Sequence, residues 1–142
     1  VEAALAAYAG HVWTLELNPQ AQTACRRNLA KFGLDNVTLI EGAAPEALPD
    51  APPEGYDSLF IGGSGGNLAS IVAQVCSQPQ PLRVVISAIT LESVAEAMAA
   101  LQAAGCQDLE VVQAAVARSR QAGSKHLMMG LNPITIIAAN KA

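Results

Sequence analysis

Long apolar runs are missing from this chain of 142 residues, although 51% of its residues are hydrophobic. The longest apolar stretches, such as ITIIAA at 134–139, are far shorter than the roughly 20 residues that a membrane-spanning helix needs. The chain is long enough, and with a mean hydropathy of +0.30 apolar enough, to bury a core. We therefore expect a single globular domain rather than a membrane segment.

Cysteines are few, and no cluster of side chains resembles a metal site. Cys25, Cys76 and Cys106 are odd in number and widely spaced, without the short intervals typical of zinc ligands. We expect them to be small buried side chains in a protein of the reducing cytoplasm. A catalytic triad is missing as well, because neither His11 nor His126 has an identifiable nucleophilic partner.

Acidic residues are absent from the last part of the chain. The net charge is −4, which argues against a general nucleic-acid-binding protein. Residues 1–110 carry all 12 acidic groups and four basic ones, whereas residues 111–142 carry four basic groups and no acid. This asymmetry is consistent with an anionic partner near the C-terminal end, and equally with a solvated basic loop. The four basic residues concerned are Arg118, Arg120, Lys125 and Lys141.

The first clear element is a strand followed by a helix. HVWTLEL, at 11–17, alternates as a strand does and ends with the acid Glu16. Asn18 is a typical helix cap, Pro19 fits the first helical position, and Gly33 fits the C-terminal end about four turns later. The sequence therefore predicts a helix between Asn18 and Gly33.

Strands and helices continue to alternate after this helix. Strands are predicted over 36–42, ending with Glu41, and then over 56–62 and 83–88. Helices are predicted from about Asn67 to Ser77 and over 91–104. This rhythm predicts an α/β fold with a Rossmann-like, doubly wound sheet.

The rhythm changes after Gly105. LEVVQAAVA at 109–117 and PITIIAAN at 133–140 are two β-rich runs, separated by polar and basic residues without a helix pattern. A parallel crossover would need a helix of a dozen residues or more, so we expect these two strands to pair antiparallel.

The first ten residues, VEAALAAYAG, resemble the last turns of a helix that has no strand before it. A doubly wound sheet ordinarily begins with a central strand and a glycine-rich turn. We therefore expect residues 1–142 to form one domain that lacks its first strand and glycine-rich loop, and the natural protein to continue upstream of Val1.

Two neighbouring strands end in acids, which favours a nucleoside ligand. Ligands of this fold lie outside the carboxyl ends of the strands. Glu16 is placed there to accept the hydroxyl hydrogens of a ribose, and Glu41 is followed by Gly42, Ala43 and Ala44, small residues that could border an adenine. A single acid at the end of a strand can also be merely solvated. The nucleoside prediction therefore rests on an acid at the same position in two neighbouring strands.

The stretch FIGGSGGNL, at 60–68, contains four glycines around Ser64. It lacks the lysine and the spacing of a phosphate-binding loop. Two alternatives remain: a simple turn into a helix, or a surface where a bulky ligand approaches the backbone closely.

Taken together, the ordered motifs resemble a known family, the decarboxylating precorrin methyltransferases of cobalamin biosynthesis. The resemblance covers essentially the whole chain and is most specific in the GGSGG loop and the final NP-containing strand. These enzymes are precorrin-6B (cobalt-precorrin-6B) carbon-15 methyltransferases, either free or as the C-terminal domain of a precorrin-6Y carbon-5,15 methyltransferase. The motifs are LELNPQA, NVTLIEGAAPEALP, YDSLFIGGSGGNL, ISAITLES, VARSRQAG and LNPITII.

The resemblance implies a class I S-adenosylmethionine-dependent methyltransferase fold and a homo-oligomer such as a tetramer. It implies that Glu16 holds the ribose and that Gly62 and Gly63 lie beside the methionine part of the cofactor. The residues implied for the adenine are Gly42, Ala43 and Ala44.

For the anionic tetrapyrrole substrate, we expect one group of residues at the reaction face and another at the peripheral carboxylates. Arginine suits the second task because it pairs with carboxylates through two parallel hydrogen bonds. The reaction-face candidates are Ser64, Asn67, Thr90 and Glu92. The carboxylate-binding candidates are Arg118, Arg120 and Lys125.

One residue departs from the family pattern, and three other functions stay open. The family usually has an acid where this chain has Ala43, which removes one expected contact to the adenine amino group. The alternatives are a class I methyltransferase acting on RNA or on a protein carboxylate, a nicotinamide-dependent dehydrogenase, and a nucleoside-binding module without catalytic activity.

Overall fold

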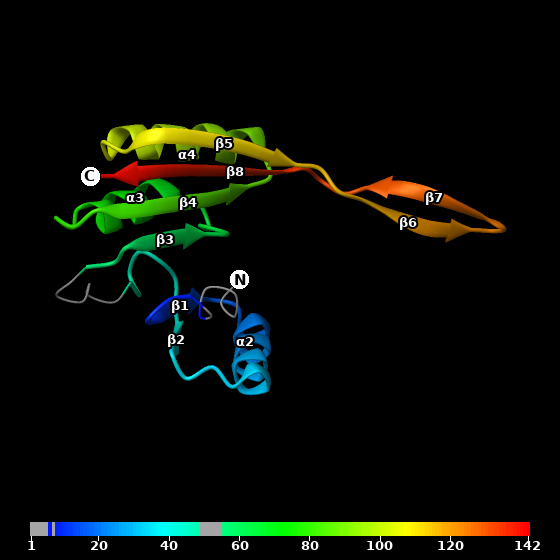
Figure 1. The fold of residues 1–142 in the computed structure, drawn as a ribbon, viewed down its shortest axis with the longest axis horizontal. Helices are drawn as coiled ribbons and strands as arrows, with labels where there is room; N and C mark the ends of the chain where they lie inside the picture. Colours follow the sequence, from blue (N-terminus) through cyan, green and yellow to red (C-terminus); the bar gives the residue numbers. More distant parts are fainter. Residues whose placement is uncertain (1–5, 7, 49–54) are drawn as a thin grey trace. The chain divides into compact units, whose positions relative to one another are not determined.

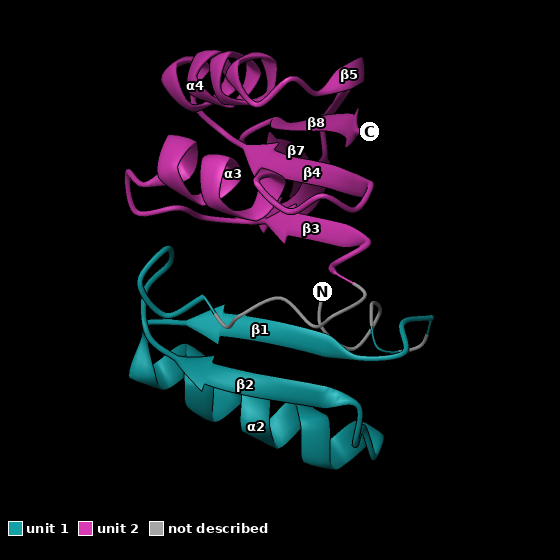
Figure 2. Ribbon diagram, turned by 90° about the vertical axis from the view of Figure 1, so that its left-hand side faces the viewer, with its two compact units in different colours: residues 1–50 teal, residues 51–142 magenta. Residues whose placement is uncertain are grey.

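The computed structural model describes Ala6 and residues 8–48 and 55–142, which fall into two compact units, residues 1–50 and residues 51–142 (Figure 2). Most of the helix predicted at 1–10, and the end of the proline-rich loop, lie outside the described residues. In the described part of the chain, no helix is long and apolar enough to span a membrane. The prediction of one domain lacking a first strand stays a prediction.

The first unit is a β-α-β arrangement. Strands β1 (Val12–Glu16) and β2 (Val37–Glu41) pair parallel, and helix α2 (Pro19–Phe32) connects them (Figure 2). The helix begins and ends as predicted. The side chain of Asn18 accepts a hydrogen bond from the Gln20 amide at 2.9 Å, and Gly33 ends the helix in the left-handed conformation at φ 62°.

The second unit is a four-stranded sheet in the order β3-β4-β8-β5. Strands β3 (Ser58–Ile61) and β4 (Leu82–Ala88) are parallel, while β8 (Ile134–Lys141) runs antiparallel to β4 and to β5 (Gln107–Ala114). Helices α3 (Leu68–Cys76) and α4 (Leu91–Ala103) lie on the same face of the sheet (Figure 1). The predicted antiparallel pairing of 109–117 with 133–140 is confirmed.

The core of the second unit lies between this sheet and its two helices. Val84 and Ile86 of β4, Ile137 of β8, Val72 of α3 and Leu101 of α4 are almost fully buried. Strand β4 alternates between buried and more exposed positions, because only one of its faces meets the helices.

Between β5 and β8 the chain forms a hairpin that the sequence did not predict. Strands β6 (Ala117–Ala122) and β7 (Lys125–Gly130) pair antiparallel through a two-residue turn in which Gly123 has φ 63°. Every residue of both strands is exposed. Figure 1 shows this hairpin, here named the arm (residues 117–130), leaving the sheet where β5 ends and β8 begins. The strand predicted at 109–117 is therefore too long, because Ala117 belongs to the arm.

Candidate functional site

The first unit brings the two strand-end acids to one edge of its sheet. Glu16 of β1 and Glu41 of β2 are direct neighbours in the parallel register. The Glu16 carboxylate accepts a hydrogen bond from the Asn18 amide through Oε1 at 2.8 Å. The backbone carbonyl of Glu16 accepts from the Gly42 amide at 3.3 Å, so the first acid and the loop after the second strand are joined.

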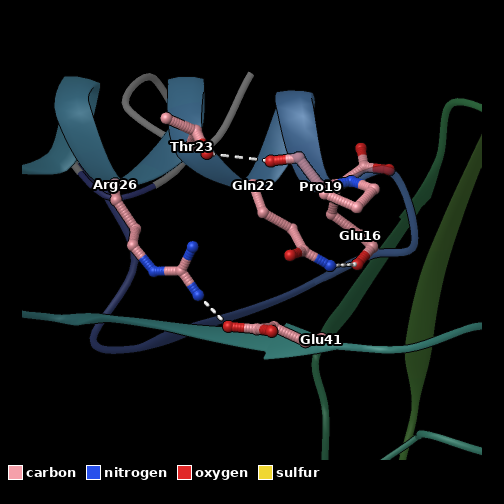
Figure 3. A network of polar contacts seen from close by, with 6 residues as sticks. All are labelled: Glu16, Pro19, Gln22, Thr23, Arg26 and Glu41. Atoms are coloured by element: carbon pink, nitrogen blue, oxygen red, sulfur yellow. Dashed lines mark hydrogen bonds and ion pairs between the residues drawn. The ribbon is translucent and has the colours of Figure 1, made fainter.

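The two acids differ in their partners. Glu41 forms an ion pair with Arg26 of α2, and both side chains are about half exposed. Figure 3 shows this pair and, one turn earlier in the helix, the Gln22 side chain reaching the Glu16 carbonyl. Glu41 thus attaches the helix to β2, whereas among the described residues the Glu16 carboxylate is held by the amide at the start of the helix alone. Of the two acids, Glu16 is the better placed for a ligand.

The loop after β2 is closed by its own backbone. Ala47 donates its amide to the carbonyl of Ala43 at 2.8 Å. A Cβ placed on Gly42 would lie only 2.6 Å from the Cβ of Ala47, so any larger residue at position 42 would push the loop apart. Ala43 and Ala44 are half-buried. This compact loop presents small side chains and backbone atoms, as the adenine prediction requires.

The second unit contains a cavity of about 200 Å³ at the carboxyl ends of β3 and β4. It joins the GGSGG loop after β3 to the turn between β4 and α4. Ile61, Gly62, Gly63, Ser64, Leu68, Ile86, Ser87, Ala88, Ile89, Thr90 and Ser93 line it. Gly62, Gly63, Ser64 and Thr90, all predicted from the sequence, therefore lie together.

Two predicted reaction-face residues do not line this cavity. Asn67 is the N-cap of α3, and Glu92 lies in the first turn of α4, so both are close in sequence to lining residues. Ser87 and Ser93 do line it, although sequence reasoning missed them. The sequence signal for Ser93 was its position three residues after Thr90, because the side chain of an N-cap threonine bonds to the backbone amide at that position.

The cavity combines an apolar floor with hydroxyl groups. Ile61 and Ile86 are buried beneath it. Thr90 Oγ1 accepts from the Ser93 amide at 3.1 Å and donates to Ser93 Oγ at 2.9 Å, which leaves the Ser93 hydroxyl hydrogen for another acceptor. None of the described residues that line the cavity is charged. Such a site suits a largely apolar ligand with a few polar atoms.

Gly63 marks the open side of this cavity. A Cβ placed on Gly63 would have no neighbour within 4 Å, whereas one on Gly62 would meet the ring of Phe60 at 3.2 Å. The backbone at Gly63 is therefore accessible to a ligand, as the prediction for the glycine loop requires.

The arm carries its basic residues on one face. Alternation along the hairpin and its register place Arg118, Arg120 and Lys125 on the same face. Leu127 and Met129 lie on this face too, because they are the direct cross-strand partners of Arg120 and Arg118. The arm begins at the end of the sheet where β4 also ends, because Ala88 pairs with Thr135 and Ala114 with Ile134. The carboxylate-binding candidates therefore form one surface, on a hairpin rooted at the cavity's end of the sheet.

The described residues include no group of three or more His, Cys, Asp or Glu side chains that could hold a metal ion. His11 bonds to Thr38 at 2.9 Å, in keeping with a structural role, and His126 lies on the exposed arm. The candidate residues offer hydroxyls, backbone amides, one carboxylate and the cations of the arm.

Known proteins are similar to nearly the whole chain. A family model described as precorrin methyltransferase domain matches residues 1–141. A protein of Methanothermobacter thermautotrophicus named "Probable cobalt-precorrin-6B C(15)-methyltransferase (decarboxylating)" is 37% identical over 94% of this chain and 69% of its own.

Solved structures of similar proteins have the same fold. A precorrin-6y C5,15-methyltransferase from Geobacter metallireducens matches with a TM-score of 0.79 and 37% identity, over 92% of this chain and 68% of its own. A precorrin-8W decarboxylase from Methanobacterium thermoautotrophicum matches with a TM-score of 0.81 and 35% identity, over 96% of this chain and 73% of its own.

A more distant structure extends the likeness of fold to another methyltransferase. A SAM-dependent O-methyltransferase from Thermotoga maritima matches with a TM-score of 0.67 at 19% identity, over 92% of this chain and 49% of its own. At that identity the likeness concerns the fold alone. The predicted class I methyltransferase fold is thereby confirmed.

Proposed function

The chain belongs to the family of precorrin methyltransferase domains, and from this we propose its reaction. It methylates a precorrin-6 tetrapyrrole at carbon 15, using S-adenosylmethionine, and removes the carboxyl group of the ring-C acetate as carbon dioxide, in the biosynthesis of cobalamin. The observation that carries the proposal is the family match over residues 1–141, together with a relative whose name specifies C(15) methylation with decarboxylation.

We propose which residues contact S-adenosylmethionine. Glu16 accepts the ribose hydroxyls, and Gly42, Ala43 and Ala44 border the adenine. Gly62 and Gly63 border the methionine part. The fit is supported by the amide-held carboxylate of Glu16, by the small side chains of its neighbouring loop, and by the open backbone at Gly63.

The cofactor supplies an electrophilic methyl group, and the protein's task is to orient the acceptor. Methyl transfer needs the two reacting atoms in line at roughly 3–3.5 Å, more than it needs a strong base. Ser64, Thr90 and Ser93 provide hydroxyls over an apolar floor of isoleucines. In our proposal these groups orient the electron-rich ring carbon and exclude water. Asn67 and Glu92 remain candidates for contacts at the rim.

We propose that Arg118, Arg120 and Lys125 hold peripheral carboxylates of the substrate. Their position on one face of the arm, with Leu127 and Met129 beside them, supports this assignment. A partly reduced tetrapyrrole has a flat apolar ring and many carboxylates, so it matches a surface that is both apolar and cationic.

We further propose a cytoplasmic homo-oligomer, a tetramer as the resemblance implies. Its support is the face of the arm that points away from Arg118 and Arg120, where Met128 is 68% exposed. Apolar side chains this exposed on a two-stranded hairpin favour contact with another chain. The face of Met128 and His126 is free for that contact, because the cationic face is assigned to the substrate.

Calorimetric titration of the full-length natural protein with S-adenosylhomocysteine and with NAD tests the cofactor. We expect S-adenosylhomocysteine to bind and NAD to fail. Incubation with S-adenosylmethionine and the tetrapyrrole, followed by mass spectrometry, should show one added methyl group and the loss of one carbon dioxide. Binding of NAD alone, or methylation of RNA in place of the tetrapyrrole, would overturn the proposal.

A further inference from the structure

We propose that Gln22 is a positioning residue for Glu16, the acid assigned to the ribose. From the second turn of α2 it fixes the backbone of Glu16 and thereby the direction of the Glu16 carboxylate. The inference rests on the proposed function, because it assumes that Glu16 meets a ribose.

Gln22 is an unusual residue for its environment. Its side chain is 7% exposed, and within the described residues only Gln22 and Gln78 are both polar and buried. Burying an amide is costly unless its hydrogen bonds are made. Gln22 Nε2 donates to the carbonyl oxygen of Glu16 at 2.8 Å, so the burial of this side chain is linked directly to the strand end (Figure 3).

The Glu16 carbonyl has a second donor, the amide of Gly42 at 3.3 Å. One oxygen atom therefore connects the helix, through Gln22, and the loop after β2, through Gly42. The Gly42 amide and the bond from the Ala47 amide to the Ala43 carbonyl hold this loop without the Gln22 side chain. Gln22 is then the donor that ties the Glu16 backbone to α2.

The segment between Glu16 and α2 is held at further points. The Asn18 amide donates to Glu16 Oε1 at 2.8 Å, and the Gln22 amide donates to the Asn18 carbonyl at 2.9 Å. With its backbone bound to Gln22 and one carboxylate oxygen bound to Asn18, Glu16 has little freedom to turn. Its other oxygen, Oε2, is thereby aimed in advance, and such preorganisation reduces the entropic cost of binding.

Neighbouring residues of the same helix lack this link, which supplies a matched control. Thr23 donates to the carbonyl of Pro19 within the helix, and Arg26 pairs with Glu41 on β2. Arg26 thus fastens α2 to the sheet without touching Glu16. A general loosening of the helix should appear in an Arg26 variant as well as in a Gln22 variant.

The test compares two ligands and three variants of the full-length protein by calorimetry. The ligands are S-adenosylhomocysteine and its 2′,3′-dideoxy analogue, which lacks the hydroxyls that Glu16 would accept. We expect Gln22→Met, which keeps the length but removes the donor, to weaken binding of S-adenosylhomocysteine about five- to tenfold. Binding of the dideoxy analogue should change less than about twofold, and Arg26→Met should alter neither ligand's affinity.

A double-mutant cycle with Glu16→Ala completes the design. In that background Gln22→Met should have no further effect on the affinity for S-adenosylhomocysteine. Equal losses for both ligands, or the same loss in Arg26→Met, would mean a purely structural role and overturn the inference. If Gln22→Met does not fold, Gln22→Leu replaces it, with the same expected results.

Failure of the proposed function looks different from failure of this inference. If the unaltered protein binds no S-adenosylhomocysteine, or if Glu16→Ala leaves its affinity unchanged, the assignment of Glu16 is overturned, and the inference with it. If Glu16→Ala weakens binding and Gln22→Met does not, only the positioning role of Gln22 is overturned.

Discussion

Two antiparallel strand pairs of the second unit have similar backbone pairing and opposite surroundings. In the pair β4–β8, Ile86 lies opposite Ile137, and both are almost completely buried under the helices. In the arm, Arg120 lies opposite Leu127, and every side chain is exposed. Pairing alone therefore does not determine what a strand contributes. The buried pair carries stability, and the exposed pair is available for recognition.

The largest effect should come from truncating the buried pair. Ile137→Ala removes a fully buried side chain and leaves a cavity, so we expect the free energy of unfolding to fall by about 2–5 kcal/mol. The matched change in the arm, Leu127→Ala, should alter it by less than about 0.5 kcal/mol, since Leu127 is exposed and lies on the face away from the proposed subunit contact. Urea denaturation followed by circular dichroism measures both. Equal losses of unfolding free energy in the two variants would contradict the division between a stabilising core and an exposed arm.

The second prediction concerns the function assigned to the arm. We expect the double change Arg118→Ala and Arg120→Ala to raise the KM for the tetrapyrrole at least about tenfold, because two charge-assisted hydrogen bonds are lost. The dissociation constant for S-adenosylhomocysteine and the unfolding free energy should stay the same. Steady-state kinetics and calorimetry measure these quantities.

Ser119 provides the control for that experiment, because it lies on the opposite face of β6 from the two arginines. Ser119→Ala should leave the KM unchanged. An unchanged KM in the double-arginine variant would defeat the assignment of the arm to substrate carboxylates.

The same contrast explains which parts of the fold could be predicted from the sequence. Helix α2 was predictable at both ends because Asn18 and Gly33 have local tasks, a side-chain cap and a left-handed turn. Strand β8 was predictable from its run of apolar residues, and its antiparallel direction followed from the lack of a crossover helix.

The arm escaped prediction because neither of its faces is buried. With no buried face, nothing selects alternating apolar and polar residues, so the run Arg-Ser-Arg-Gln resembles a loop. Its only local signal was the Gly123 turn. Residues that meet only through tertiary structure were also missed, such as Ser87 and Ser93 in the cavity.

Cysteines show the same limit of sequence reasoning. Cys76, at the end of α3, is buried as expected, whereas Cys25 and Cys106 are only partly buried. The Sγ atoms of Cys76 and Cys106 lie 4.0 Å apart although 30 positions separate them in the chain. Their proximity depends on the packing of α3 beside α4 and the start of β5, which no local pattern encodes.

The smallest predicted effect is a pH dependence of the unfolding free energy, which arises from the buried core and not from the arm. Burial, followed by the nearby Cys106, raises the pKa of the Cys76 thiol from 9.0 to about 11. Below pH 9 the thiol is protonated in both the folded and the unfolded chain, so it causes no pH dependence. Between pH 9 and 11 the unfolded chain loses this proton while the folded protein keeps it, and stability falls as the pH rises.

Above about pH 11 the thiol ionises in the folded protein too, and this contribution levels off. Lysines and tyrosines also titrate in this range, so the measurement is a difference between the unaltered protein and Cys76→Ala. Urea denaturation at intervals from pH 8 to pH 11 should show a steeper loss of unfolding free energy in the unaltered protein. A change in the arm, such as Met128→Ala, should leave that steepness as it is, because the arm contains no thiol. If the two curves of unfolding free energy against pH are parallel for the unaltered protein and Cys76→Ala, the pKa of the Cys76 thiol is not raised by folding.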